Sequence, residues 1–498
     1  MTFFANLCYN YNVYKTQCAY KKFRGAIMRI EQDFLGEIQI PDEVYYGVQT
    51  MRAMENFKIT GYTADPMFIR ALGIVKKAAA LANLNVGLLD ETIGKAIVQA
   101  ANEVIEGKLD AHFPIDPIQG GAGTSFNMNV NEVLCNRALE ILGRPRGDYE
   151  YISPNNHANM SQSTNDVIPT AIRICALMRG EALVHELGRL ARSFETKAEE
   201  FKSILKIGRT HLQDAVPMTL GSEFLAFATS VRRSKKRIVG HLTHLHTMNM
   251  GATAVGTGLN ADPEYIKEVE KQLSTITGHF FTTAENLVDA TSNTDIFTDV
   301  SGSLKVTALA LIKIANDLRL MASGPRAGFG EITLPPRQPG SSIMPGKVNP
   351  VIPEVVNQTC YQVIANDLAV TFGVENGQFQ LNVMEPVMAY NLFNSFRFLT
   401  NAVNAFRTLC VDGIQANEQT CRDWLDKSVG IVTALLPHIG YTTCSALAKE
   451  ALATNRPIKQ LIIEKGVLSE KELDIILAPE QMTRPGIAGK ELLKKVQL

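Results

Sequence analysis

The sequence predicts a mainly α-helical protein with a central bundle of very long helices. From residue 171 onward, apolar residues recur at three- and four-residue spacing, the pattern of one apolar stripe along a helix. Alternating strands and helices are not visible, and "GGAGTS" at residues 120–125 lacks the final glycine of a dinucleotide-binding fingerprint. A helix of about 30 residues is about 45 Å long, so several such helices must lie side by side to bury their stripes.

Five segments carry this helical pattern, and each is far longer than the average helix of about three turns. The predicted helices cover residues 171–205, 222–250, 295–323, 353–375 and 385–414. Pro169 is predicted to lie just before the first of them, where its missing N–H costs little.

Composition narrows the class of protein. The 498 residues are 46% hydrophobic and 20% charged, which is ordinary for a soluble globular chain. A net charge of −1 gives no basic footprint for nucleic acid, so a small-molecule substrate is the better prediction. No apolar run reaches transmembrane length, and membrane association is not expected.

Eight scattered cysteines without a C-x-x-C pair favour buried thiols in a reducing compartment, and the cytoplasm is the predicted location.

The chain is predicted to begin with a poorly ordered extension. Residues 1–27 contain four basic residues and no acid, but the charges come last, unlike those of a secretory signal, and Met28 offers an alternative start. Three domains are predicted after it: an N-terminal mixed region over 28–163, a central long-helix domain over 164–416 and a small helical domain over 417–498.

The loop "GSSIMPGKVNP", residues 340–350, combines hydroxyl groups with the fixed charge of Lys347. It does not fit a nucleotide-binding P-loop, because five residues rather than four separate Gly340 from Gly346 and Val348 occupies the hydroxyl position. Its composition suits a carboxylate. Considered alone, a solvated surface loop is the simpler alternative.

Four connections share dense hydroxyl and amide groups, few charges and glycines that permit close backbone approach. Their candidate binding residues are Thr124, Ser163, Thr164, Asn165, Thr210, His211, Ser341, Ser342, Lys347 and Asn349. Neutral donors can bind a dicarboxylate without burying many charges, and one or two cations then set the net charge of the site. Simpler alternatives exist, because residues 163–166 could cap a helix and a lone histidine is more often structural.

Three histidines in "HLTHLH", His241, His244 and His246, form a candidate metal cluster. They lack the i, i+4 pair and the glutamate of a zinc-protease helix. A solvated helix face is therefore favoured, and neither a metal nor another cofactor is predicted.

Taken together, these loops resemble the fumarase/aspartase superfamily, from about Arg29 to the C-terminus. "GSSIMPGKVNP" looks like the signature of that superfamily. Within it, "DPIQGGAGTSFNMNVNEV", "SQSTNDVIPTA", "GRTHLQDAVPMTLGSEF" and "MTRPGIAGK" look most like the aspartate ammonia-lyases. Fumarases more typically read GSGTQ at residues 121–125 and have Thr in place of Leu212.

The resemblance implies a three-domain fold whose long helices form the core of a homotetramer, with each site built from three subunits. It also implies reversible, non-oxidative deamination of L-aspartate to fumarate and ammonia, through proton abstraction from Cβ and an enediolate intermediate. Two alternatives stay open: a fumarate hydratase, and an inactive structural or binding protein on the same scaffold.

The resemblance also assigns roles to the candidate residues. Ser341 would be the general base, on a mobile loop that closes over the substrate. The β-carboxylate would be held by Thr124, Ser163, Thr164 and Ser342, the α-carboxylate by Lys347 and Asn349, and the amino group would face Asn165, Thr210 and His211.

Overall fold

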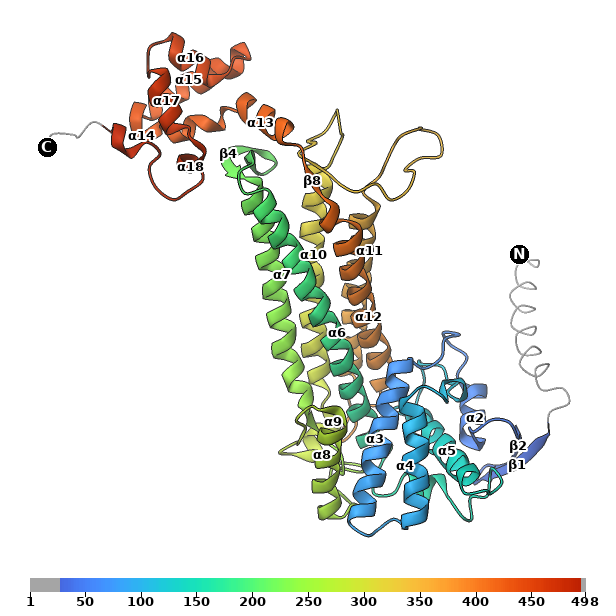
Figure 1. Ribbon diagram of the computed structural model, residues 1–498. Helices are drawn as coiled ribbons and strands as arrows, with labels where there is room; N and C mark the ends of the chain where they lie inside the picture. The colour runs from blue at the N-terminus through green and yellow to red at the C-terminus, as the bar shows by residue number, and fades with distance from the viewer. Residues whose placement is uncertain (1–26, 494–498) are drawn as a thin grey trace. The chain divides into compact units, whose positions relative to one another are not determined.

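The protein is mainly α-helical, as predicted, in a computed structural model that describes residues 27–493 (Figure 1). All but the last residue of the predicted N-terminal extension lies outside the described residues. The described chain divides into two compact units. Unit 1 comprises residues 27–181, 238–304 and 364–397, and unit 2 comprises residues 182–237, 305–363 and 398–493. The division into three domains stays a prediction.

Five long helices dominate the fold, and all five were predicted. They are α6 (Thr164–Glu200), α7 (Leu220–Leu242), α10 (Asp295–Met321), α11 (Val351–Glu375) and α12 (Glu385–Leu409). The prediction was too long for α7, because a 3₁₀ turn, η3 (Thr243–His246), and the short strand β5 (Thr247–Met248) follow it.

The prediction that Pro169 precedes the first long helix was wrong, because Pro169 lies inside α6. Proline has no N–H to donate to the carbonyl four residues earlier, which here belongs to Asn165. That carbonyl accepts a hydrogen bond from Asn249 Nδ2 at 3.0 Å instead. A side chain distant in sequence thus satisfies the group that proline leaves free, and α6 can start at Thr164.

Unit 1 combines a β-hairpin with shorter helices that pack around α3. Its further elements are β1 (Met28–Asp33), β2 (Gly36–Pro41), α2 (Val48–Asn56), α3 (Pro66–Asn85), α4 (Glu91–Ile105), α5 (Thr124–Ile141), α8 (Pro263–Thr277), β6 (Thr282–Thr283) and α9 (Leu287–Ser292). Strands β1 and β2 pair antiparallel, with Arg29 opposite Ile40. Phe68 of α3 contacts Phe126 of α5 and Phe393 of α12, with 5.4 Å between ring centroids in both pairs.

Unit 2 holds a phenylalanine cluster between three of the long helices. Phe194 of α6 lies 5.7 Å from Phe227 of α7 and 6.2 Å from Phe406 of α12, measured between ring centroids. All three rings are buried. Burying a side chain of this size contributes about 1.5–3 kcal/mol, so the aromatic contacts help to hold these helices together.

The remaining elements of unit 2 are short. They are β3 (Leu205–Thr210), β4 (Gln213–Thr219), β7 (Ile332–Thr333), β8 (Gln415–Ala416), α13 (Glu418–Lys427), α14 (Leu436–Ile439), α15 (Tyr441–Thr454), α16 (Ile458–Glu464), α17 (Glu470–Ile476) and α18 (Pro479–Met482). Helices α13 to α17 contribute residues to one apolar cluster that also contains Ile207 of β3. Gly430 passes so close to β4 that a Cβ atom would lie 1.9 Å from the Ala215 carbonyl oxygen, so only glycine fits there.

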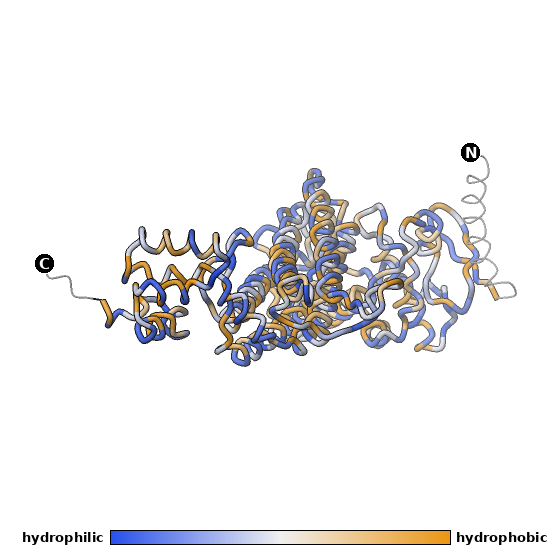
Figure 2. The backbone as a smooth tube through the Cα atoms, turned by 90° about the horizontal axis from the view of Figure 1, so that it is seen from above, coloured by the Kyte–Doolittle hydropathy of each residue, from blue (hydrophilic) through white to orange (hydrophobic). Residues whose placement is uncertain are grey.

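Apolar and polar residues alternate along the helices, as Figure 2 shows. Among residues 27–493, no helix is both long enough and apolar enough to cross a membrane.

A buried ionic cluster ties the β3–β4 hairpin to the start of β7. The fully buried carboxylate of Glu331 lies 2.8 Å from Lys206 Nζ and 2.7 Å from Arg209 Nη1. Burial acts to lower the pKa of Lys206, but the charges of Glu223 and Glu331 outweigh it and raise that pKa. Because water cannot replace a lost partner here, the cluster fixes the strand that carries Thr210.

We expect Glu331→Gln to lower the free energy of unfolding by about 3–5 kcal/mol, because it removes the carboxylate partner of Arg209 and one of the two carboxylate partners of Lys206. The matched control is Glu199→Gln on α6, whose ion pair with Lys202 is largely exposed and should contribute little. Urea unfolding followed by circular dichroism measures both variants. Equal stability of the two would contradict the structural role of Glu331.

Candidate active site

The predicted site residues are distributed over both units. Unit 1 contains Thr124 and the segment 163–165, and unit 2 contains Thr210, His211 and the loop over 340–350. Thr124 is the first residue of α5, and Thr164 is the first residue of α6. Helix N-termini offer unpaired N–H groups and the positive end of the helix dipole, which favour a bound anion.

The start of α6 is held by Asp166. One carboxylate oxygen accepts the Ser163 N–H at 2.9 Å, and the other accepts the N–H groups of Gly251 and Thr253 at 3.2 and 3.1 Å. Burial raises the pKa of Asp166 to about 6, although these hydrogen bonds act to lower it. Ser163 Oγ accepts the Asn165 N–H at 3.2 Å, so the predicted helix-capping role is present. A hydroxyl that accepts one bond still has its own hydrogen to donate.

A second network lies behind this segment and centres on Asn159. Its Oδ1 accepts from Lys76 Nζ and from Asn127 Nδ2, both at 3.1 Å, and from Asn131 Nδ2 at 3.2 Å. Asn127 Nδ2 also lies 3.3 Å from Thr164 Oγ1. The network therefore links α3 and α5 to the first residue of α6.

Sequence reasoning missed this supporting network. A signal was present, because Asn127 and Asn131 are four residues apart and must lie on one face of a helix. Nothing in the sequence indicated that Lys76, buried in the middle of α3, would reach the same network.

The side chains of Thr124 and Asn165 each donate a hydrogen bond to a backbone carbonyl group in this structure. The Thr124 hydroxyl donates to the Gly121 carbonyl at 2.7 Å, a bond that it must exchange to reach a carboxylate. Asn165 Nδ2 donates to the Ala254 carbonyl at 2.7 Å, which leaves its Oδ1 available as an acceptor.

In unit 2, His211 and Leu212 form the two-residue turn between β3 and β4. Their φ values of 55° and 58° both lie in the left-handed region, as in a type I′ hairpin turn. Such turns strongly favour Asn-Gly, so histidine and leucine are held here at a cost in backbone strain. Strain of this kind concentrates at functional sites, which supports a role for His211.

The loop over residues 340–350 closes on itself. The Gly340 N–H donates to the Lys347 carbonyl at 2.7 Å, and Asn349 Nδ2 donates to the Gly340 carbonyl at 2.8 Å. A Cβ atom at Gly340 would lie 2.8 Å from both the Lys347 carbonyl oxygen and the Asn349 nitrogen, so glycine is required.

Ser341 receives two backbone hydrogen bonds inside this loop. Its Oγ accepts the N–H groups of Ile343 at 3.2 Å and Met344 at 2.9 Å. It also lines an open cavity of about 410 Å³, together with Arg337 and Lys347. The two backbone donors would stabilise negative charge on the serine oxygen.

The structure does not bring every predicted residue of unit 2 together. Within the described part of the chain, no hydrogen bond connects the His211 turn with the Ser341 loop. Each of these segments is organised by its own local contacts.

Comparison with known proteins identifies the family. Residues 36–365 match the family described as "Lyase", and residues 431–484 match "Fumarase C C-terminus". An aspartate ammonia-lyase from a Bacillus species is 57% identical over 464 residues, which cover 93% of this chain and 99% of the relative. The chain belongs to the aspartate ammonia-lyase family. An aspartate ammonia-lyase from Helicobacter pylori strain 26695 is 52% identical over 92% of this chain and 98% of its own length.

Solved structures agree with membership of the fumarase/aspartase superfamily. A cobalt-bound "fumarate lyase:delta crystallin" from Brucella melitensis matches with a TM-score of 0.90 and 50% identity, over 92% of this chain and 100% of that one. A class II fumarase from Schistosoma mansoni matches with a TM-score of 0.88 and 35% identity, over the same shares. The predicted superfamily is thus confirmed, while the individual site residues stay predictions.

We expect the free energy of unfolding to depend less on pH in Lys76→Met than in the wild type. Burial lowers the pKa of Lys76 to about 7, so between that value and its ordinary pKa the unfolded chain binds more protons than the folded chain. As the pH rises from about 7 to 9, the free energy of unfolding of the wild type should therefore increase by on the order of 2 kcal/mol relative to that of Lys76→Met. Urea unfolding at both pH values measures this difference. A difference that does not change with pH would show that Lys76 does not titrate in this range.

Proposed function

We propose that the protein catalyses the reversible, non-oxidative deamination of L-aspartate to fumarate and ammonia. The observation that carries this proposal is the 57% identity to an aspartate ammonia-lyase along nearly the whole of both chains. The organised loop around Ser341 supports it further, because an inactive scaffold has no need of a serine hydroxyl stabilised in this way.

Ser341 is the general base in this proposal. A serine oxygen can remove a proton from carbon only if its negative charge is stabilised, and the N–H groups of Ile343 and Met344 already point at its Oγ. Lys347 and Arg337 line the same cavity and add positive charge to it. Closure of this loop over the substrate would exclude water and fix the reacting geometry.

The β-carboxylate is the group that must accept charge when the Cβ proton leaves. Thr124 and Thr164 at two helix N-termini, with Ser163 and Ser342, supply hydroxyl and backbone donors for its oxygens. Donors of this kind stabilise the enediolate more than the substrate, because the carboxylate charge grows in the transition state. The electron pair of the enediolate then forms the C=C bond of fumarate, and the ammonium group of the substrate leaves with the C–N bonding electrons as ammonia.

The α-carboxylate and the amino group of the substrate carry opposite charges and therefore need different partners. Lys347 and Asn349 hold the α-carboxylate in this proposal, while Asn165, Thr210 and His211 face the amino group. The hydrogen bond from Asn165 Nδ2 to Ala254 fits this role, because it turns the amide so that Oδ1 can accept from the substrate ammonium.

We also infer a homotetramer with shared active sites, in the cytoplasm. Exposed apolar side chains recur at helical spacing on α10, at Val306, Leu309 and Leu320, and Val355 and Tyr361 are exposed on α11. Apolar stripes on long helices are expected to be covered by other helices, here those of further subunits. The six described cysteines are buried and unpaired with one another, which fits a reducing compartment.

Turnover of Ser341→Ala tests the proposed mechanism. We expect kcat for fumarate formation from L-aspartate to fall by about 10²–10⁴-fold, the usual contribution of a general base, with the fold unchanged. Ser342→Ala should mainly raise KM, because that residue binds substrate, and Ser230→Ala on α7 serves as a surface control. Ultraviolet absorbance of fumarate measures all three. Near-normal kcat in Ser341→Ala would remove Ser341 from the role of base.

A further inference from the structure

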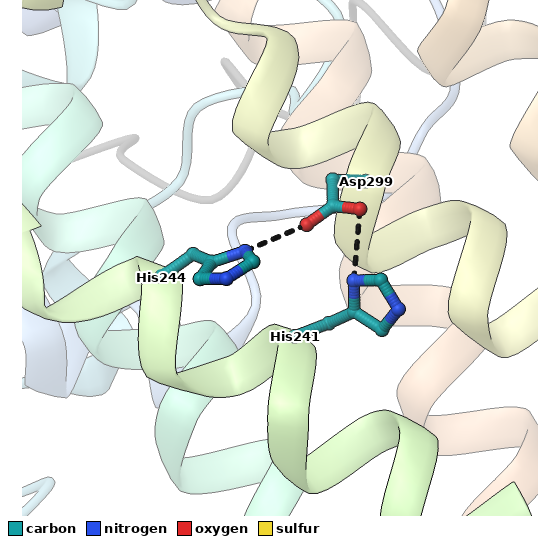
Figure 3. Close-up of side chains that lie close together, drawn as sticks. All are labelled: His241, His244 and Asp299. Carbon is teal, nitrogen blue, oxygen red and sulfur yellow. Dashed lines mark hydrogen bonds and ion pairs between the residues drawn. The ribbon is translucent and has the colours of Figure 1, made fainter.

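Three side chains of unit 1 converge at the end of α7. His241 lies in the last turn of α7, His244 in η3, and Asp299 in the second turn of α10 (Figure 3). His241 Nδ1 lies 2.8 Å from Asp299 Oδ1, and His244 Nδ1 lies 2.9 Å from Asp299 Oδ2. Both imidazole rings thus direct a nitrogen at the same carboxylate, one at each oxygen.

Each histidine contacts the Asp299 carboxylate through Nδ1. His241 Nδ1 is buried and lies 2.8 Å from Asp299 Oδ1, an ion-pair contact. His244 Nδ1 forms a hydrogen bond with Asp299 Oδ2, at 2.9 Å. An unprotonated imidazole nitrogen and a carboxylate oxygen are both metal ligands, so the two groups can hold an ion once the side chains rotate slightly apart.

The spacing of the donor atoms suits a metal ion. One ligand atom from each of the three residues can be chosen so that all lie within 4.8 Å of one another. Atoms that bind one ion at about 2.0–2.2 Å must lie about 3–4 Å apart, so small side-chain rotations are sufficient. The side chains are 31%, 57% and 37% exposed for His241, His244 and Asp299, so an ion can enter from solvent and keep water ligands.

We propose that His241, His244 and Asp299 form a binding site for one divalent ion of the Zn²⁺ and Co²⁺ class. Two imidazole nitrogens and one carboxylate oxygen are a ligand set for zinc and related first-row metals, whereas Mg²⁺ and Ca²⁺ prefer oxygen ligands alone. The sequence prediction of a solvated helix face overlooked Asp299. His246, the third histidine of the motif, lies apart and packs against His279 and Phe281 instead.

The ion would be structural rather than catalytic, because none of its ligands belongs to the proposed substrate site. It would join the end of α7 to α10 just before the segment that contains Asn249, Gly251 and Thr253. Those three residues hold the first turns of α6 through Asn165 and Asp166. Metal binding would thus stabilise the chain segment that supports Thr164.

Metal titration of the chain without an affinity tag tests the proposal. Chelator-treated protein is dialysed against Zn²⁺, Co²⁺ or Mg²⁺, and bound metal is measured by mass spectrometry. We expect about one Zn²⁺ or Co²⁺ per chain and no Mg²⁺. We expect His244→Ala and Asp299→Asn to weaken Zn²⁺ binding by at least about 10-fold.

His185→Ala is the matched control, because His185 is an exposed histidine with an acidic neighbour and is outside the cluster. It should bind Zn²⁺ as the wild type does. Circular dichroism checks that each variant is folded, and His244→Ala is the decisive variant because its side chain is the most exposed of the three. Absence of bound Zn²⁺ in the wild type, or unchanged affinity in His244→Ala, would overturn the proposal and leave Asp299 as a hydrogen-bond acceptor for the histidines.

Discussion

The hydrogen bonds of the buried Asp166 carboxylate are the interaction on which the proposed substrate-binding region of unit 1 depends. They join the first turn of α6 to Gly251 and Thr253, two residues far away in sequence. Without this acceptor, the N–H groups of both segments would be buried without partners, each at a cost of about 1–3 kcal/mol. Thr164 is thereby held at a helix start that no local sequence signal could fix alone.

Unit 2 uses the same principle with a different acid. Glu331 is fully buried between Lys206 and Arg209, and it secures the hairpin whose turn contains His211 in a strained conformation. In both units, a buried carboxylate organises the scaffold, while the proposed substrate contacts are mostly hydroxyl and amide groups. That division suits a dicarboxylate substrate, because hydroxyl and amide groups can bind its carboxylates without burying further charge.

The sequence predicted the long helices because their apolar stripes repeat over many turns, and neither a strand nor an irregular loop produces a three-and-four spacing of that length. It did not predict the start of α6, because Pro169 is tolerated only through Asn249, 84 residues away from Asn165. The pairing of His244 with Asp299, 55 residues apart, was equally invisible. The motif around Ser341 was readable because its contacts are local, whereas the Lys76 network depends on three separate segments of the chain meeting.

The measurement that tests the central claim most directly is fumarate formation by one preparation given L-aspartate in one cuvette and L-malate in another. Ultraviolet absorbance follows the product in both. Deamination of aspartate by the proposed site predicts a rise with L-aspartate and none with L-malate. A rise with L-malate alone would make the protein a fumarase, and no rise from folded protein in either cuvette would equally contradict the proposed activity.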